Sequence, residues 1–174
     1  VLKWENDFTN QNYYFDIVRC VLRYFKLYDL KAKITTTTNI PEQAGLAGST
    51  ALLSAVLSAV AAYMGHDYHK YHLAELNRII ELNFMKTHCG YQDAYMTIFG
   101  GLNYLDFRGK EYYKHLEKEQ YGVVEPLTPF LKETPLPFII AYTGIKHHSG
   151  QFHKPLRDRW LEGDQTVIKA YNQI

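Results

Sequence analysis

The chain has 174 residues, of which 47% are hydrophobic, enough to bury a sizeable core as one domain or as one domain and part of a second. With 19 Lys and Arg against 18 Asp and Glu, the formal net charge of +1 creates no field that would recruit nucleic acid or an anionic membrane. The two cysteines are far apart and lack metal-ligand spacing, which favours a reduced, cytoplasmic compartment. Any anionic ligand must therefore be bound by a local site.

Hydrophobic periodicity and helix-breaking residues predict a mixture of helices and strands. The predicted helices are Tyr13–Tyr28, Thr50–Met64 and His69–Asn83. The predicted strands are Lys31–Asn39, Phe99–Phe107 and Phe138–Tyr142, and the charged segment Arg108–Glu133 between the last two is predicted to be loop-like.

The helix predicted over Thr50–Met64 contains almost only Ala, Leu, Val and Ser. It is shorter than the roughly 20 residues that cross a bilayer, and it carries Ser54 and Ser58, so we interpret it as a buried helix. Gly65 follows it, and the freedom of glycine at positive φ is typical of a helix C-terminus.

A glycine-rich turn precedes this helix and has the features of an anion site. Two glycines and two hydroxyl residues lie between the predicted strand and the first helical turn. The unpaired N–H groups of that turn and the positive end of the helix dipole favour a phosphate, and glycine allows close backbone approach. The turn is neither a Walker A loop nor a dinucleotide fingerprint. The alternative is a tight turn whose serine only caps the helix.

A single acid, Asp93, lies between Gln92 and a later double glycine at 100–101. Phosphoryl transfer needs positioning, charge neutralisation and a group that orients or deprotonates the acceptor hydroxyl, which one Asp can supply. The alternative is an Asp that caps the following helix.

Residues 143–160 place many hydrogen-bond donors after the last predicted strand. The guanidinium groups of Arg157 and Arg159 suit a carboxylate or phosphate, and Ser149-Gly150 could present backbone N–H groups to an acidic substrate. Two other interpretations use the same segment: a solvated basic face, and a zinc site formed by His147, His148 and His153. The zinc interpretation lacks support, because no Cys or acidic residue lies at a spacing that would complete the ligand set.

The segment Pro41–Ala51, PEQAGLAGSTA, is similar to the phosphate-binding motif of GHMP kinases, where a proline and three residues precede Gly-Leu-small-Gly-Ser-Ser/Thr-Ala. In that family the loop wraps the phosphates of ATP. The resemblance implies ATP and Mg²⁺ as cofactors, with Ser49 and Thr50 as candidate metal or phosphate ligands. The nucleotide-contacting positions that it implies are Gly45, Leu46, Ala47, Gly48, Ser49 and Thr50.

The segment Cys89–Tyr95, CGYQDAY, with the later FGG resembles the Gly-x-x/Gln-Asp segment and double glycine of GHMP sugar kinases. The resemblance implies that Asp93 is the catalytic base or orients the acceptor, with Gln92 beside it as a substrate contact. Family members carry a metal-binding Glu at about this distance upstream, which implies that role for Glu81. The alternative for Glu81 is an exposed charge on a helix face.

Residues 149–164 are similar to the start of the carboxy-terminal domain of the glucuronokinase branch of this family, Ser-Gly-x-x-His-x-x-x-Arg-x-Arg-Trp-Leu-x-Gly-Asp. The resemblance implies an ATP-dependent phosphotransferase whose acceptor is a sugar acid such as glucuronate, phosphorylated at its anomeric hydroxyl. It also implies substrate contacts at Ser149, Gly150 and Arg157. A heptose phosphate, galactose or fucose are the rival acceptors.

The resemblance implies an α+β fold: a mixed sheet covered by helices on one face, like domain 2 of ribosomal protein S5, then the start of a ferredoxin-like second domain. Residues 1–125 would form the ATP-phosphate-binding N-terminal domain without its first strands, and residues 126–174 would begin the C-terminal domain. The family's basic, Asn-rich opening motif and its closing glycine-rich loop do not occur here, and Ala47 and Ala94 replace residues common in relatives. A non-catalytic nucleotide or sugar sensor, or a purely structural domain, are the alternatives.

Overall fold

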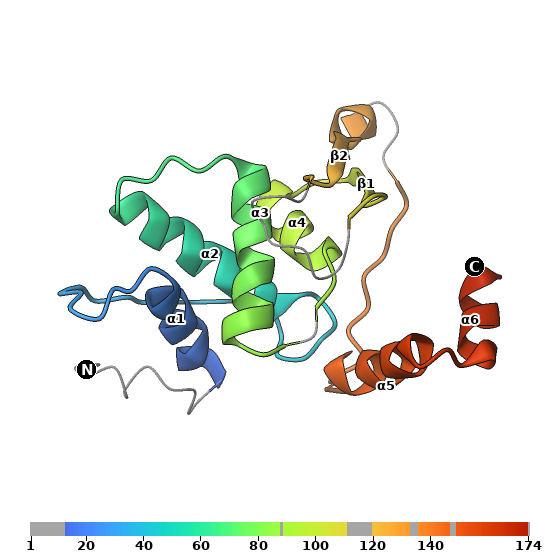
Figure 1. The fold of residues 1–174 in the computed structure, drawn as a ribbon. Helices are drawn as coiled ribbons and strands as arrows, with labels where there is room; N and C mark the ends of the chain where they lie inside the picture. The colour runs from blue at the N-terminus through green and yellow to red at the C-terminus, as the bar shows by residue number, and fades with distance from the viewer. Residues whose placement is uncertain (1–12, 88, 111–119, 133–135, 147–148, 174) are drawn as a thin grey trace.

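The computed structural model of the chain describes residues 13–87, 89–110, 120–132, 136–146 and 149–173 (Figure 1). Its helical part contains α1 (Tyr13–Tyr24), α2 (Gly48–Tyr63), α3 (Lys70–Ile79), the π-helical turn η2 (Ile80–Phe84) and α4 (Gln92–Phe99). Strands β1 (Asn103–Asp106) and β2 (Val123–Pro126), the 3-10 helix η4 (Thr128–Lys132), and helices α5 (Ser149–Leu161) and α6 (Gln165–Asn172) follow. The α+β class is as expected.

The helices pack around α2, which contacts α1, α3 and α4. One face of α1 and much of α2 are apolar, so their association with α3 and η2 removes a continuous apolar surface from water. The buried residues of this core are Ile17, Cys20, Val21, Leu22, Leu53, Val56, Leu57, Val60, Leu76 and Ile80. Among the described residues, no helix combines the length and apolarity that crossing a bilayer requires.

Helix ends follow local backbone chemistry. Gly65, at φ 78°, ends α2 as expected: its N–H donates to the Ala62 carbonyl, and the His66 N–H donates to the Ala61 carbonyl, a Schellman motif. Lys26, at φ 55°, ends α1 in the same way, which is why this helix stops before Tyr28. The sequence pattern missed this stop because lysine carries no left-handed preference.

A second, smaller core joins α3 and α4 to the β-hairpin. Tyr95 is fully buried, and its hydroxyl donates to the carboxylate of Glu75 and accepts the N–H of Gly122 at 2.8 Å. Lys110 forms an ion pair with the same carboxylate at 2.6 Å, with both side chains almost fully buried. This buried polar cluster fixes the hairpin against the helices, because a buried charge is tolerated only when it is paired.

The sheet is smaller than expected. Among the described residues it consists of the antiparallel pair β1–β2, with Asn103 opposite Pro126, so the expected mixed sheet is wrong for this part of the chain. Strand β1 confirms the strand expected after the double glycine, whereas β2 lies in the segment expected to be loop. The expected boundary after Glu125 falls within β2, and the division into two domains stays a prediction, as do the S5-like and ferredoxin-like topologies.

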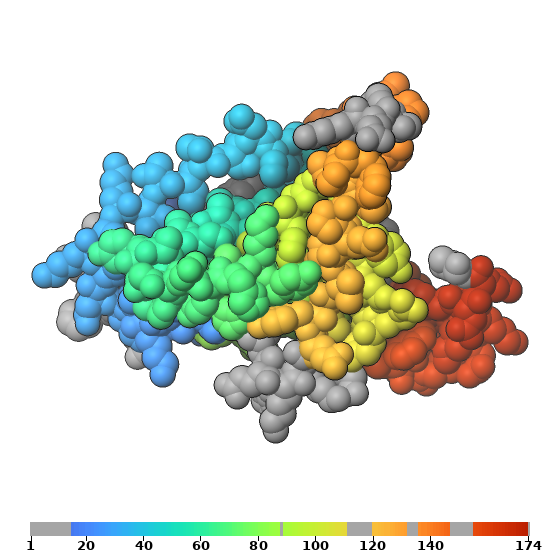
Figure 2. All heavy atoms as spheres, turned by 90° about the horizontal axis from the view of Figure 1, so that it is seen from above, coloured from blue at the N-terminus to red at the C-terminus, as the bar shows by residue number. Residues whose placement is uncertain are grey.

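Two segments predicted as strands are not strands in the structure. Residues Lys31–Asn39 and Phe138–Tyr142 form no ladder with any described residue, and Ile139 is 94% exposed. Figure 2 shows the light-blue segment containing residues 31–39 on the outer surface of the helical layer. β-Branched composition favours an extended backbone, but a strand also needs a partner whose N–H and C=O groups pair with its own.

Candidate functional site

The glycine-rich turn is held in an unusual backbone conformation. Gln43, Gly45 and Ala47 have φ of 56°, 73° and 51°, so three alternate residues are left-handed. α2 then begins at Gly48, where an added Cβ would lie 3.2 Å from the Ile40 Cγ2 atom. The close approach of Ile40 gives a steric reason for glycine at this position.

The helix cap at this turn differs from the capping alternative. The N-cap of α2 is Ala47, which makes no side-chain hydrogen bond to the first turn, and Ser49 lies inside the helix rather than at its cap. Alanine has no acceptor, so the N–H groups of the first turn are not used by an N-cap side chain. The turn therefore retains the donors that an anion site requires.

Replacing Ala47 by glycine is expected to raise the free energy of unfolding by about 0.5 kcal/mol. A left-handed alanine costs roughly 1–2 kcal/mol, and the greater freedom of glycine in the unfolded chain offsets part of that gain. Chemical denaturation would measure the change. The matched variant is Gly45→Ala, where no atom crowds the new Cβ but φ is +73°, and it should lower the free energy of unfolding by about 1 kcal/mol. Shifts of the same sign in both variants would contradict this account.

The first turn of α2 contacts the carboxylate of Glu81. The Thr50 hydroxyl donates to Glu81 Oε1 at 2.6 Å, and both side chains are buried, with 4% and 2% of their residues' surface exposed. The interpretation of Glu81 as an exposed helix-face charge is therefore wrong. Of the two candidate hydroxyl ligands, Thr50 is the one placed against Glu81, while Ser49 is its half-buried neighbour in the same turn.

Burial raises the pKa of the Glu81 carboxyl above its usual range, although the hydrogen bonds from Thr50 and Cys89 lower it in part. The negative charge of Asp93 raises this pKa further and the positive charge of Arg78 lowers it, so the two carboxylates act on each other electrostatically. The Oε2 atom of Glu81 is buried and receives no hydrogen bond from an N–H or O–H group of the described residues. A buried carboxylate oxygen in this state can serve as a cation ligand.

Glu81 lies in the π-helical turn η2, which continues α3. The N–H of Met85 donates to the Ile80 carbonyl at 2.9 Å, five residues earlier, so the turn is wider than an α-helical one. Such π-helical turns occur often at functional sites. Hydrophobic periodicity predicted the helix here but not this local widening.

Asp93 is an exposed residue in the first turn of α4, whose N-cap is Tyr91. The N-cap makes no side-chain hydrogen bond, and Asp93 lies inside the helix, so the capping alternative does not describe it. A carboxylate in the first turn is stabilised by the helix dipole. Gln92, the preceding residue, is also exposed.

Arg78 was not singled out from the sequence, although it contacts the segment that leads to Asp93. Its guanidinium carbon lies 3.8 Å from the centroid of the Tyr91 ring, and the Lys110 Nζ lies 4.7 Å from the same centroid. A cation over an aromatic face is attracted by the ring quadrupole. Tyr91 is thus held by two cations directly before Gln92 and Asp93.

The C-terminal residues implicated by the sequence are placed in and before α5. Ser149 and Gly150 begin this helix, and Arg157 is half-buried on it. The Nζ atom of Lys146, before the helix, lies 2.8 Å from a carboxylate oxygen of Glu42 in the glycine-rich turn. Figure 1 shows α5 and α6 beside the rest of the molecule.

Arg159 has a structural role, because it pairs at 2.8 Å with Asp164, whose carboxylate caps α6 through the N–H groups of Thr166 and Val167. His147 and His148, and the side chain of His153, lie outside what the structure describes. Within the described part of the chain, no group of three or more His, Cys, Asp or Glu could hold a metal ion.

The family model described as GHMP kinases N terminal domain matches residues 12–101, which contain the phosphate loop, Glu81 and Asp93. This chain belongs to the GHMP kinase family. The expected membership is therefore confirmed, and the members of this family include ATP-dependent sugar kinases, which typically use Mg²⁺.

Among relatives of this GHMP kinase chain, Glucuronokinase 1 of Arabidopsis thaliana is 29% identical over 163 residues, 89% of the chain and 41% of the relative. Probable glucuronokinase 2 of the same plant is 31% identical over 159 residues, with the same shares of the two chains. A galactokinase of Thermotoga maritima is 34% identical over 95 residues, 52% of the chain and 27% of the relative. The chain thus spans about two fifths of the length of the glucuronokinases it matches. No solved structure matches it.

The residues at this end of α2 fit a Mg²⁺–nucleotide complex. The buried Oε2 of Glu81 lacks a strong donor, the Thr50 hydroxyl lies beside the same carboxylate, and the first turn of α2 begins at the left-handed loop. Carboxylate and hydroxyl oxygens are ligands that Mg²⁺ accepts together with phosphate oxygens and water.

Proposed function

We propose that the protein containing this chain is an ATP-dependent sugar kinase that transfers the γ-phosphoryl group to a sugar hydroxyl. The observation that supports this best is the contact between Thr50 and Glu81 at the phosphate-loop end of α2, with Asp93 electrostatically coupled to Glu81. A phosphoryl-transfer site needs an anion cradle, a cation ligand and a group for the acceptor hydroxyl. These residues offer one candidate for each.

Each residue is assigned a role from its place. The backbone N–H groups of residues 45–50 hold the phosphates, Thr50 or Ser49 and Glu81 hold the cation, and Asp93 orients or deprotonates the acceptor hydroxyl. Bound Mg²⁺ would supply neutralisation of the phosphate charge. The exposure of Asp93 leaves its carboxylate accessible to an acceptor, whereas Glu81 is buried.

We further infer that the acceptor is a sugar acid such as glucuronate, phosphorylated at its anomeric hydroxyl. This rests on the glucuronokinase relatives, which match 89% of the chain, and on the guanidinium of Arg157, which suits a carboxylate. Gln92, Ser149 and Gly150 are the other proposed substrate contacts. A cytoplasmic location stays a prediction.

The test is ADP release from Mg·ATP by the longest natural form of the protein, with glucuronate, galacturonate, galactose, fucose, mevalonate and heptose 7-phosphate as acceptors. We expect ADP with glucuronate and a loss of turnover when Mg²⁺ is chelated. ADP formed with a neutral hexose alone would reject the sugar-acid assignment and keep the kinase. Binding of Mg·ATP without ADP from any acceptor would favour a non-catalytic sensor, and absence of binding would reject the phosphate site.

A further inference from the structure

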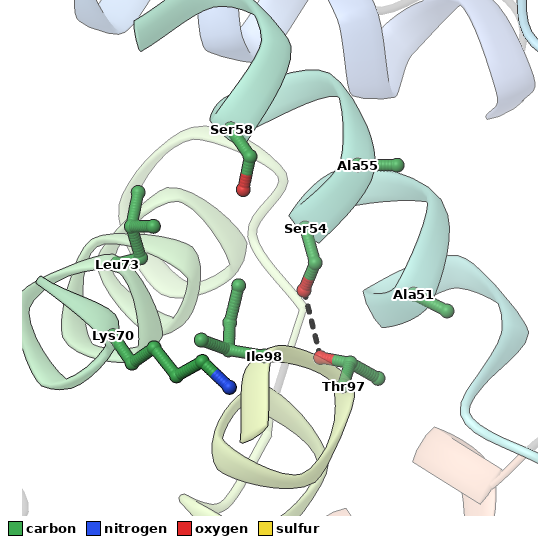
Figure 3. Close-up of a pocket in the computed structure, with 8 residues that line it drawn as sticks. All are labelled: Ala51, Ser54, Ala55, Ser58, Lys70, Leu73, Thr97 and Ile98. Atoms are coloured by element: carbon green, nitrogen blue, oxygen red, sulfur yellow. Dashed lines mark hydrogen bonds between the residues drawn. The ribbon is translucent and has the colours of Figure 1, made fainter. Parts of the chain in front are cut away.

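A chain of hydrogen bonds, buried at Asn77 and exposed at Asp93, runs from the N-terminal end of α2 to the first turn of α4. The Asn77 side chain on α3, with none of its residue surface exposed, donates through Nδ2 to the Thr50 carbonyl at 3.2 Å and to Ser54 Oγ at 2.5 Å. Ser54 Oγ lies 2.7 Å from Thr97 Oγ1, a hydrogen bond drawn as the dashed line in Figure 3. Thr97 Oγ1 donates to the Asp93 carbonyl at 2.9 Å. The chain connects the residues flanking the proposed cation and acceptor positions.

The direction of this chain follows from donor counting. A carbonyl only accepts, so the group of Asn77 that faces Thr50 must be its NH₂, which also supplies the second N–H to Ser54. The Thr97 hydroxyl faces the carbonyls of Asp93 and Ala94, and when its one proton goes to either of them, Ser54 donates to Thr97 and accepts from Asn77. Every bond then points from α3 through α2 to α4, and Asn77 is the one group in the chain that supplies two donors.

We propose that Asn77 is a positioning residue. It sets the distance from the Thr50–Glu81 pair to the first turn of α4, which carries Asp93. This inference rests on the proposed kinase function. Asn77 touches neither of the two carboxylates through these bonds, and it acts through backbone carbonyls at both ends. The two hydrogen bonds of Asn77 are buried and the Ser54–Thr97 bond is part-buried, so these three bonds are costly to break and resist a relative shift of α2 and α4.

The spacing matters because a small misplacement of a catalytic group has a large kinetic effect. A displacement of about 1 Å can lower a rate on the order of 100-fold. These hydrogen bonds set the distance between the turn before α2 and Asp93. Their loss is therefore expected to lower kcat more than it lowers the affinity for Mg·ATP. Loss of stability alone would not separate these two quantities.

Thr97 offers the most discriminating variants, since its hydroxyl is the last link and it is half-buried. Thr97→Val keeps the shape and removes the link, whereas Thr97→Ser keeps the hydroxyl. In the longest natural form of the protein, we expect Thr97→Val to lower kcat roughly 10-fold to 100-fold with Mg·ATP affinity little changed, and Thr97→Ser to restore it. Ser58→Ala is the control, because Ser58 lies one turn along α2 and lines the same groove as Ser54 and Thr97 (Figure 3).

Unchanged kcat in Thr97→Val, or an equal loss in Thr97→Ser or Ser58→Ala, would overturn the proposal. If the wild-type protein forms no ADP with any acceptor, the proposed function fails instead, and a double-mutant cycle still decides the link. Asn77→Ser and Thr97→Val should then change the folding equilibrium constant non-additively, by about threefold or more relative to the product of the single effects. A double variant whose effect equals the product of the two single effects would show that Asn77 and Thr97 are not connected by hydrogen bonds.

Discussion

Replacing Asp93 by asparagine is expected to lower kcat on the order of 10²-fold to 10⁴-fold, while Mg·ATP still binds. Asparagine has nearly the same shape but cannot accept a proton from the acceptor hydroxyl, and general base catalysis contributes an effect of this order. Asp93 is exposed and lies in the first turn of α4, so in the free protein its replacement removes a favourable dipole interaction together with its repulsion of the Glu81 carboxylate. Steady-state ADP release and calorimetric titration with Mg·ATP would measure the two quantities.

A matched control for this variant is Asp67→Asn, which removes one exposed negative charge before α3 and away from the candidate site residues. It should leave kcat unchanged. Turnover of Asp93→Asn close to that of the wild type would show that another group handles the acceptor proton. A parallel loss of nucleotide binding would instead assign Asp93 to the architecture of the site.

Replacing Glu81 by glutamine is expected to have opposite effects on the free protein and on the complex. Without ligand, the free energy of unfolding should rise, because burial penalises the carboxylate and glutamine can still accept the Thr50 hydrogen bond. With Mg·ATP, the stabilisation that the wild type gains on binding should be largely lost, since a cation ligand is missing. Thermal unfolding with and without Mg·ATP would show both.

The difference in the free energy of unfolding between Glu81→Gln and the wild type, measured without ligand, should depend on pH with a defined sign. The pKa of Glu81 is raised in the folded protein, so at pH above its ordinary value of 4.5 the unfolded chain ionises first and the wild type loses stability relative to Glu81→Gln. The advantage of the variant should therefore grow as pH rises from that value and level off above the folded-state pKa. An advantage that shrinks over this window would contradict the burial argument.

Glu75→Gln provides the contrasting control on the same helical stretch. Glu75 is equally buried, but it is paired with Lys110 at 2.6 Å and accepts the Tyr95 hydroxyl. Removal of the Glu75 charge leaves the buried Lys110 cation without its carboxylate, and the free energy of unfolding should fall by about 3 kcal/mol or more. The two neighbouring buried glutamates should thus respond to the same substitution with opposite signs.

The first three helices of the molecule could be predicted from the sequence, whereas α4, α5 and α6 were not among the predicted helices. Apolar residues at helical spacing determined α1, α2 and α3, and Gly65 determined where α2 ends, because these signals lie within a few residues of each other. The glycine-rich turn before α2 could be located in the same way, since the donors of a helix N-terminus and the glycines beside them are local features, and its role in binding phosphate stays a prediction. Family membership followed from such segments and is confirmed.

The strands could not be predicted as reliably. The segments at Lys31–Asn39 and Phe138–Tyr142 have strand composition but no partner among the described residues, whereas β2 lies in a stretch that looked like a loop. Strand formation depends on a second strand that is distant in sequence, so composition alone does not decide it. The same distance effect hides the ion pair between Glu75 and Lys110.

For this protein, the sequence alone determined the family, the main helices and the residue types that can serve phosphoryl transfer. Only the tertiary structure decided that Glu81 is buried against Thr50, that Asp93 is exposed, and that Asn77 links α2 to α4 through Ser54 and Thr97. The physical reason is that helix formation and backbone donors at a helix start are local. Burial, pKa and hydrogen-bond direction arise where segments 20 to 43 residues apart meet, as Tyr95 with Glu75 and Thr97 with Ser54 do.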